Sequence, residues 1–125
     1  MTERYIINFY NMHGELFNKD IVIALWKEAA DCEYKRSKMY MNAVIENTDI
    51  ICSEYEGCKG MMMGVRVTSI RNPVYCSNTV EYYDSMRRVI LDVKQALRNP
   101  YTSISVIETN YFYFEDIWYA DTGQQ

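Results

Sequence analysis

Apolar residues follow two different periods along the chain, and together these periods predict an α+β fold. Residues 4–11 alternate with a period of two, which places Tyr5, Ile7 and Phe9 on one face of a predicted strand. Gly14 follows soon after and predicts a turn, because glycine adopts positive φ values at little cost. The chain is therefore expected to open with a strand that ends in a tight turn.

The next segment predicts a helix over residues 24–36, where the composition favours helix. For residues 15–23 two interpretations remain open. Asp20 can cap a helix that begins here, whereas the β-branched run 21–23 suits a strand paired with the first one. The residues expected on the apolar face of the helix are Val22, Leu25, Trp26, Ala29 and Cys32.

Residues 39–70 are interpreted as a meander of three strands separated by two polar turns. A glycine within the last of these strands, Gly64, indicates a bulge or the close approach of another backbone. The predicted strands are Met39–Glu46, Ile50–Glu56 and Met61–Ile70, with turns at 47–49 and 57–60.

The clearest element is a long amphipathic helix over about residues 78–98. Asn78 is a suitable N-cap, and Glu81 three residues later completes a capping box. Asn99 can take the left-handed conformation, and Pro100 prevents continuation of the helix. The apolar stripe expected to face the core consists of Tyr83, Met86, Ile90, Val93 and Leu97.

Residues 101–114 predict a final strand, in which 111–114 carry aromatic side chains on both faces. The end of the chain, 121–125, is expected to fray. The prediction is thus a single domain over 1–125, with a mostly antiparallel sheet of four to six strands. The sheet packs on one long helix (about 78–98) and a shorter helix (about 24–36).

Composition limits the partners of this chain. It has 125 residues, a net charge of −4 and a pI of about 5.0, so we expect no binding to extended nucleic acid. No apolar run approaches the roughly 18 residues of a membrane span, and the first residues do not resemble a signal peptide. A cytoplasmic location is therefore expected, with free thiols at the four cysteines. The abundance of Ile, Asn, Tyr and Lys fits an AT-rich genome, such as that of a low-GC bacterium or its phage.

Motifs for metal or cofactor binding and for catalysis are not evident. Cys52 and Cys58 are the closest pair of cysteines, and their spacing across a predicted hairpin does not fit zinc. His13, the single histidine, lies in a predicted turn. The Gly57–Gly60 segment matches a G-x-x-G pattern, but strands on both sides favour a hairpin turn. We therefore expect no metal, no cofactor and no catalytic residue.

The basic and aromatic residues suggest a first hypothesis, a non-catalytic protein that sequesters a small anionic ligand such as a signalling nucleotide. Arginine can pair with phosphate while tyrosine stacks on a base. Helix-dipole and i,i+4 effects explain part of this charge pattern equally well, so the hypothesis requires the arginines to converge. The candidate ligand-binding residues are Arg66, Arg71, Tyr82, Arg87, Arg88 and Tyr113.

A second hypothesis concerns the methionine triplet 61–63, of which at least one side chain must point away from the core of a strand. Together with Trp118 and the tyrosines, it suggests a homo-oligomer or an inhibitor of a host protein that acts by direct contact. A strand buried on both sides explains the same pattern. A small enzyme that uses an acid or His13 is a third alternative.

Overall fold

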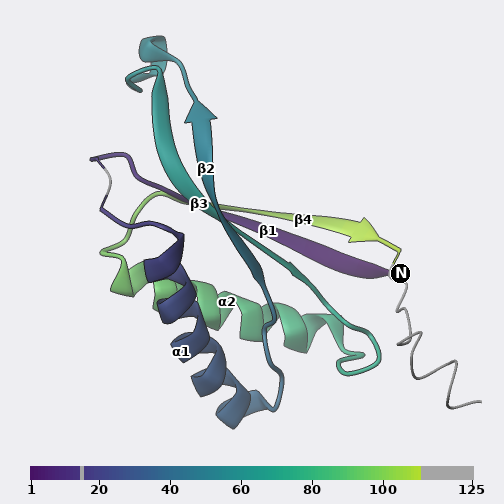
Figure 1. The fold of residues 1–125 in the computed structure, drawn as a ribbon. Coiled ribbons are helices and arrows are strands. Elements are labelled where there is room, and N and C mark those ends of the chain that lie inside the picture. The colour runs from purple at the N-terminus through teal and green to yellow at the C-terminus, as the bar shows by residue number, and fades with distance from the viewer. Residues whose placement is uncertain (15, 111–125) are drawn as a thin grey trace, which may run out of the picture.

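The computed structural model describes residues 1–14 and 16–110, and its elements follow in the order β-α-β-β-α-β (Figure 1). A short 3-10 turn, Glu54–Glu56, lies between the second and third strands. The elements are β1 (Thr2–Tyr10), α1 (Lys19–Ser37), β2 (Val44–Ile51), β3 (Met61–Ile70), α2 (Thr79–Ala96) and β4 (Thr102–Thr109).

The strands form one antiparallel sheet in the order β2-β3-β1-β4, with both helices on the same face (Figure 1). This arrangement is a ferredoxin-like α+β fold and confirms the predicted fold class. The expectation that the first helix is the shorter one is wrong, because α1 has 19 residues and α2 has 18. Alternate residues of the central strands face the helices and form the core. They include Tyr5, Ile7, Phe9, Val65 and Val67, all nearly inaccessible to solvent.

Helix α1 settles the alternatives left open for residues 15–23. It begins directly after Asn18, whose side-chain oxygen accepts a hydrogen bond from the Ile21 amide at 3.1 Å, so that Asn18 rather than Asp20 is the N-cap. Val22 is buried, whereas Cys32 is exposed and Glu33 takes the buried position beside it. The β-branched run therefore lies in the first turn of a helix, where packing outweighs its preference for strands.

The three-stranded meander predicted for 39–70 is wrong, because β2 and β3 form a single hairpin. The polar segment 47–49, predicted as a turn, lies within β2 and pairs with β3. It is polar because β2 is the edge strand, and Asn47 accepts a hydrogen bond from the first amide of α1, that of Lys19, at 2.8 Å. The close backbone approach predicted at Gly64 is confirmed, since a Cβ there would lie 2.9 Å from the Phe9 carbonyl oxygen.

Helix α2 and its caps are confirmed, with one correction to its buried stripe. The Asn78 side chain accepts a hydrogen bond from the Glu81 amide at 3.0 Å, and Asn99 has a φ of 57°. Tyr83, however, is 42% exposed, and the neighbouring Tyr82 occupies the core position. Tyr82 shares a helix face with the buried stripe at 86, 89, 93 and 97, from which Tyr83 is displaced by about 100°.

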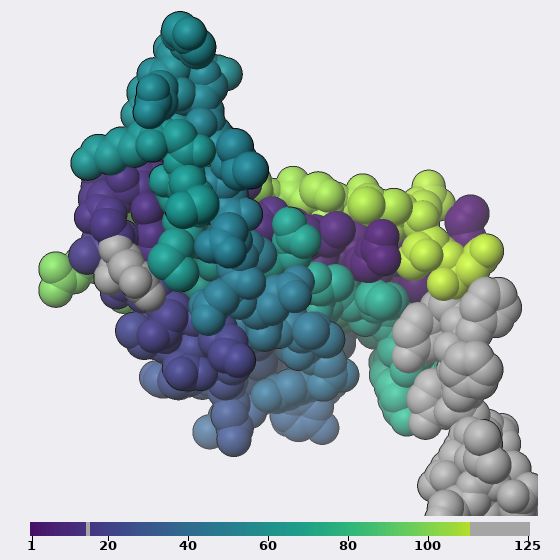
Figure 2. All heavy atoms as spheres, turned by 45° about the horizontal axis from the view of Figure 1, so that its top comes forward, coloured from purple at the N-terminus to yellow at the C-terminus, as the bar shows by residue number. Residues whose placement is uncertain are grey.

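The β2–β3 hairpin extends beyond the helices as an arm, which we call the hairpin arm and define as residues 49–63 (Figures 1 and 2). Large apolar side chains on it are exposed, with Ile51 at 88%, Tyr55 at 100% and Met61 at 60%. A disulfide joins Cys52 to Cys58 at its tip, so the expectation of free thiols is wrong for this pair. The aromatic run 111–114 and the tail 121–125 lie outside the described residues.

Candidate functional site

The face of the sheet opposite the helices carries a row of polar side chains at one level of all four strands. We call this surface the open face and the row, made of Glu46, Arg66, Asn8 and Ser103, the polar row. Arg66 is the Cα partner of both Glu46 on β2 and Asn8 on β1, and Asn8 is also the partner of Ser103 on β4. Because strands place alternate residues on opposite faces, this register brings the four side chains together.

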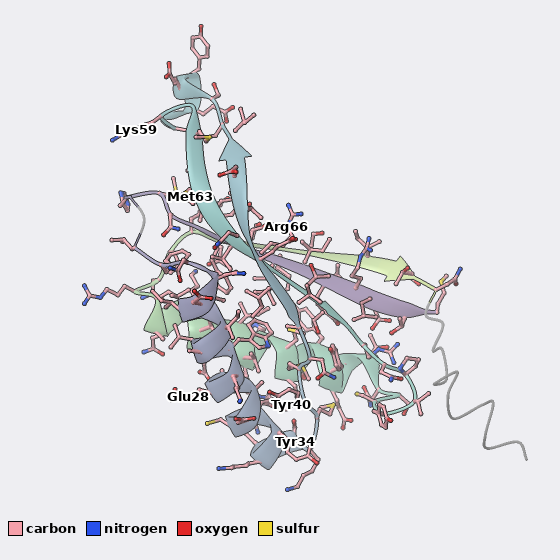
Figure 3. All side chains as sticks on the ribbon, viewed as in Figure 1. Glu28, Tyr34, Tyr40, Lys59, Met63 and Arg66 are labelled. Atoms are coloured by element: carbon pink, nitrogen blue, oxygen red, sulfur yellow. A yellow bond between two sulfur atoms is a disulfide. The ribbon has the colours of Figure 1, made fainter. Side chains whose placement is uncertain are left out.

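Arg66 lies at the centre of the polar row, where the hairpin arm joins the rest of the sheet (Figure 3). Its Nε donates a hydrogen bond to Asn8 Oδ1 at 3.3 Å, which leaves the terminal nitrogens of the guanidinium for other acceptors. Arg66 and Glu46 are both exposed. The ion pairs formed by the described residues use other carboxylates, Glu33 and Glu3. The row therefore presents a cation and an anion side by side.

Two tyrosines border the polar row on the side of the hairpin arm. The Tyr10 hydroxyl lies 2.9 Å from Ser103 Oγ, and its ring centroid lies 5.3 Å from that of Tyr101. This hydrogen bond fixes the Tyr10 ring at the edge of the row. Aromatic faces attract cations, so the site can hold a positively charged group as well as an anion.

The opposite end of the open face is apolar and partly exposed. Val44 is 69% exposed, Ile107 41% and Ile70 38%, and their places in the register put them on one surface. Two side-chain atoms on the same face, Arg4 Nε and Thr48 Oγ1, are buried without a hydrogen-bond partner among the described residues. Exposed apolar patches and unpaired buried polar atoms both mark surfaces that commonly have a binding partner.

Those of the predicted ligand-binding residues that lie within residues 1–14 and 16–110 are on different surfaces of the molecule. Arg66 lies on the open face, whereas Arg71 directly follows the end of β3 and is buried. Arg71 is 5% exposed and forms a bidentate ion pair with Glu3, at 2.7 and 3.0 Å. The hydrogen bond from Arg71 lowers the pKa of Glu3.

The remaining predicted residues have structural contacts or lie elsewhere. Tyr82 is buried, its hydroxyl is 3.0 Å from Ser69 Oγ, and burial raises its pKa. Arg88 donates to the buried Glu33 at 3.0 and 2.8 Å, which lowers the pKa of that carboxyl. Arg87 is exposed on α2, and Tyr113 is outside the described residues.

A groove of about 710 Å³ lies beside the hairpin arm, between its tip and the loop that follows β1. We call it the tip groove. Asn11, His13 and Lys59 are among its polar lining residues, and Met63 is one of several methionines in its wall (Figure 3). The groove combines flexible apolar surface with one imidazole and one ammonium group.

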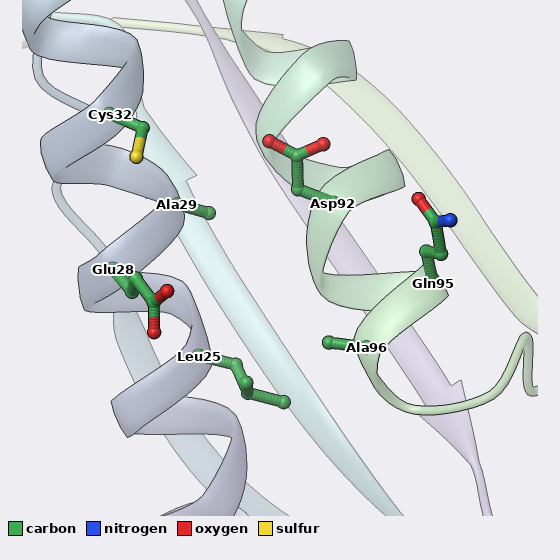
Figure 4. Close-up of a pocket in the computed structure, with 7 residues that line it drawn as sticks. All are labelled: Leu25, Glu28, Ala29, Cys32, Asp92, Gln95 and Ala96. Atoms are coloured by element: carbon green, nitrogen blue, oxygen red, sulfur yellow. The ribbon is translucent and has the colours of Figure 1, made fainter.

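A smaller cleft of about 340 Å³ separates α1 from α2 on the outer side of the helix layer (Figure 4). Ala29 and Ala96 leave space between the helices, and Glu28 and Asp92 place carboxylates on its two sides. The charged side chains that line this cleft, Glu28 and Asp92, are both acidic. The cleft therefore lacks the pair of opposite charges found in the polar row.

Sequence reasoning identified only Arg66 among the residues of the polar row. Asn8 is a polar residue within an otherwise mostly apolar segment, and Glu46 directly follows the apolar run 43–45, which are the signals that mark them. The turn expected at 47–49 places Glu46 at the end of a predicted strand. The continuous strand instead aligns it with Arg66.

Comparison with known proteins adds a family and two structural relatives. The family described as SAM lyase has a model that matches residues 1–115. No curated protein sequence matches the chain. A de novo designed protein with a ferredoxin fold is similar over 92% of each chain, with a TM-score of 0.44 and 13% identity.

A cofactor-independent oxygenase from Streptomyces nogalater, SnoaB, is similar over 90% of this chain and 98% of its own. Its TM-score is 0.35 and its identity 13%. At these scores neither structure carries information about function. Within residues 1–14 and 16–110, no helix has the length and apolar character needed to cross a membrane. In the same part of the chain, no three His, Cys, Asp or Glu side chains form a metal-binding group.

Proposed function

The chain belongs to the SAM lyase family, and on this premise we propose that it is an enzyme that cleaves S-adenosylmethionine bound on the open face. The observation that carries the placement is the polar row, in which Arg66 and Glu46 are adjacent on neighbouring strands. This proposal takes a different ligand from the anionic nucleotide expected from the sequence, because S-adenosylmethionine has an adenine base but carries a positive sulfonium.

The charges of the substrate match the groups of the polar row. S-adenosylmethionine has a carboxylate, an ammonium group and a sulfonium close together on one short chain. A guanidinium such as Arg66 binds a carboxylate, and a carboxylate such as Glu46 binds an ammonium group. The Tyr10 ring lies beside the row, hydrogen-bonded to Ser103, and can contact the sulfonium. The net charge of −4 attracts a substrate whose net charge is positive.

In this reaction the main contribution of the protein is to orient the substrate. A sulfonium leaves as a neutral thioether, so cleavage of its bond to the amino-acid chain requires no strong acid. The carboxylate of the substrate can itself attack Cγ, form a carbon–oxygen bond and expel the thioether with the electron pair of the broken carbon–sulfur bond. The products are a lactone and methylthioadenosine, and no water or redox partner is consumed. A site that holds carboxylate and ammonium at fixed positions favours this folded geometry.

A second copy of the chain is proposed to cover the open face. Val44, Ile70 and Ile107 are partly exposed on it, and such an apolar patch would be buried by self-association. Closing this surface would also exclude water from the polar row and strengthen its electrostatic contacts. The homo-oligomer expected from the sequence thus remains a proposal, and we propose the open face as its interface.

The experiment is to incubate the purified chain with S-adenosylmethionine and detect methylthioadenosine by liquid chromatography and mass spectrometry. Wild type should form it, Arg66→Ala should lose most of the activity, and Arg87→Ala should retain it. Arg87 is a matched control because it is an exposed arginine on α2, which lies on the other face of the sheet. Binding without turnover would indicate a sequestering protein, and absence of binding would refute the proposal.

A further inference from the structure

The tip of the hairpin arm contains two cysteines held as neighbours by the backbone. Cys52 and Cys58 are joined by a disulfide and have their Cα atoms 5.8 Å apart, within the usual range for such bonds. The Cys52 amide donates to the Gly60 carbonyl at 3.1 Å, and the Cys58 amide donates to the Ser53 carbonyl at 3.1 Å. Main-chain hydrogen bonds therefore bring the two side chains together.

The loop between the cysteines is ordered by contacts that do not involve sulfur. Ser53 accepts a hydrogen bond from the Tyr55 amide at 3.0 Å, and Gly57, with a φ of 92°, donates to the Glu54 carbonyl at 3.2 Å. These bonds favour the approach of the two cysteines after reduction, so the disulfide can form again, whereas the disulfide itself limits opening of the loop. The tip lies away from the helices, with Glu54, Tyr55 and Glu56 exposed and Cys52 and Cys58 half-buried, so small thiols can reach the pair.

The same pair borders the tip groove. Cys58 lines this groove of about 710 Å³ together with Gly57, Lys59 and the methionines of β3, and His13 lies on its other side. A change in the loop at 53–58 therefore changes one wall of the tip groove. Cys32 and Cys76 are free, and neither lines it.

We propose that Cys52 and Cys58 form a reversible redox clasp that fixes the hairpin tip and the wall of the tip groove. In the closing step, one thiolate attacks a low-molecular-weight disulfide and releases one small thiol. The second thiolate then displaces the other small thiol and closes the protein disulfide. Two electrons and two protons pass from the cysteines to the small disulfide. A dithiol opens the clasp by the reverse exchange. The proposal does not depend on cleavage of S-adenosylmethionine.

The state of the clasp can be read by alkylation of the full-length native chain, followed by mass spectrometry. After treatment with oxidised glutathione, Cys52 and Cys58 should be recovered as an internal disulfide without added glutathione, whereas the exposed Cys32 should be recovered as a free thiol or as a mixed disulfide with glutathione. After dithiothreitol, Cys52 and Cys58 should both be alkylated. The conformation of the tip can be read with a protease that cleaves after glutamate, because Glu54 and Glu56 are exposed within the loop. Cleavage there should be several-fold faster in the reduced chain.

Matched variants separate the clasp from the other thiols. The double variant Cys52→Ser/Cys58→Ser should be cleaved at the reduced rate in both buffers, whereas Cys32→Ser/Cys76→Ser should keep the dependence on redox state. His13 is the single histidine, so its ring resonance in a proton NMR spectrum reports directly on the groove and should shift between the two states. Failure of the pair to oxidise, equal cleavage rates in both states, or an unmoved His13 resonance would each overturn the proposal.

Discussion

Arg66 and Asn8 are direct neighbours across β1 and β3, and Arg66 Nε donates to Asn8 Oδ1 at 3.3 Å on the open face. This contact orients the guanidinium without neutralising it. Among the described residues, Arg66 forms no ion pair, so its charge is available to a ligand. Arg71 and Arg88, in contrast, are paired with carboxylates. The proposed role of the polar row depends on this difference.

The first prediction concerns the orientation of Arg66. Asn8→Ala removes the acceptor, so the guanidinium is less restricted and the KM for S-adenosylmethionine should rise several-fold. A hydrogen bond of this kind contributes about 1 kcal/mol, which corresponds to a factor of about five. Steady-state kinetics measure the effect. Ser105→Ala, on the same face two residues along β4 from Ser103, should leave KM unchanged, and an equal rise in both variants would contradict the assignment.

The second prediction concerns the link between the helices. Arg88→Ala leaves the carboxylate of Glu33, 5% exposed, without its main partner. The free energy of unfolding should fall by about 2 kcal/mol, less than for a fully buried pair because Arg88 is 39% exposed. Urea unfolding followed by circular dichroism measures this loss. The neighbouring Arg87→Ala should change stability by less than about 0.5 kcal/mol, and similar effects of the two substitutions would refute the prediction.

The third prediction is an acid-induced loss of stability. Arg71 and Arg88 hold the pKa values of Glu3 and Glu33 below their usual range in the folded chain. A carboxyl with a lower pKa in the folded state stabilises the fold above its unfolded pKa of about 4.3. This stabilisation is lost as pH falls through the lower folded value. The melting temperature should therefore drop as the pH falls below about 4.3, and less steeply in Glu3→Gln/Glu33→Gln. Identical pH profiles would contradict this account.

The fourth prediction concerns the close approach of strands at Gly64. Ala at this position would place a Cβ 2.9 Å from both the Phe9 carbonyl oxygen and Ile50 Cδ1. The backbone contact cannot be relieved by a side-chain rotation, so Gly64→Ala should destabilise the sheet by about 1–3 kcal/mol. Chemical denaturation measures the change. Gly64→Ala with wild-type stability would show that the two strands can separate at no cost.

Much of the fold was predictable because the relevant signals are local. The caps of α2 and the alternation of β1 lie within short segments, and both elements were located correctly. The meander was not, because a polar segment such as 47–49 resembles a turn unless its partner strand is known. The prediction that Tyr83 rather than Tyr82 faces the core is wrong for a similar reason. Both residues are tyrosines, and only the packing of α2 distinguishes them.

The candidate site was less predictable than the fold. Its residues come from four strands far apart in sequence, and only the register aligns Glu46, Arg66 and Asn8. The sequence predicted Arg71 and Arg88 as ligand-binding residues. It could not show that they pair with Glu3 and Glu33, because these ion pairs depend on tertiary contacts. The disulfide between Cys52 and Cys58 was likewise not predictable, because it depends on the turn that brings the two cysteines together.

The most direct test of the central claim is the rate of methylthioadenosine formation from S-adenosylmethionine by wild type, Arg66→Ala and Arg87→Ala, with folding of each variant verified by circular dichroism. We predict product with wild type and Arg87→Ala, and a loss of most of the activity with Arg66→Ala. Equal rates for the three proteins would show that cleavage takes place away from the open face. Absence of product with wild type would contradict the proposed activity itself.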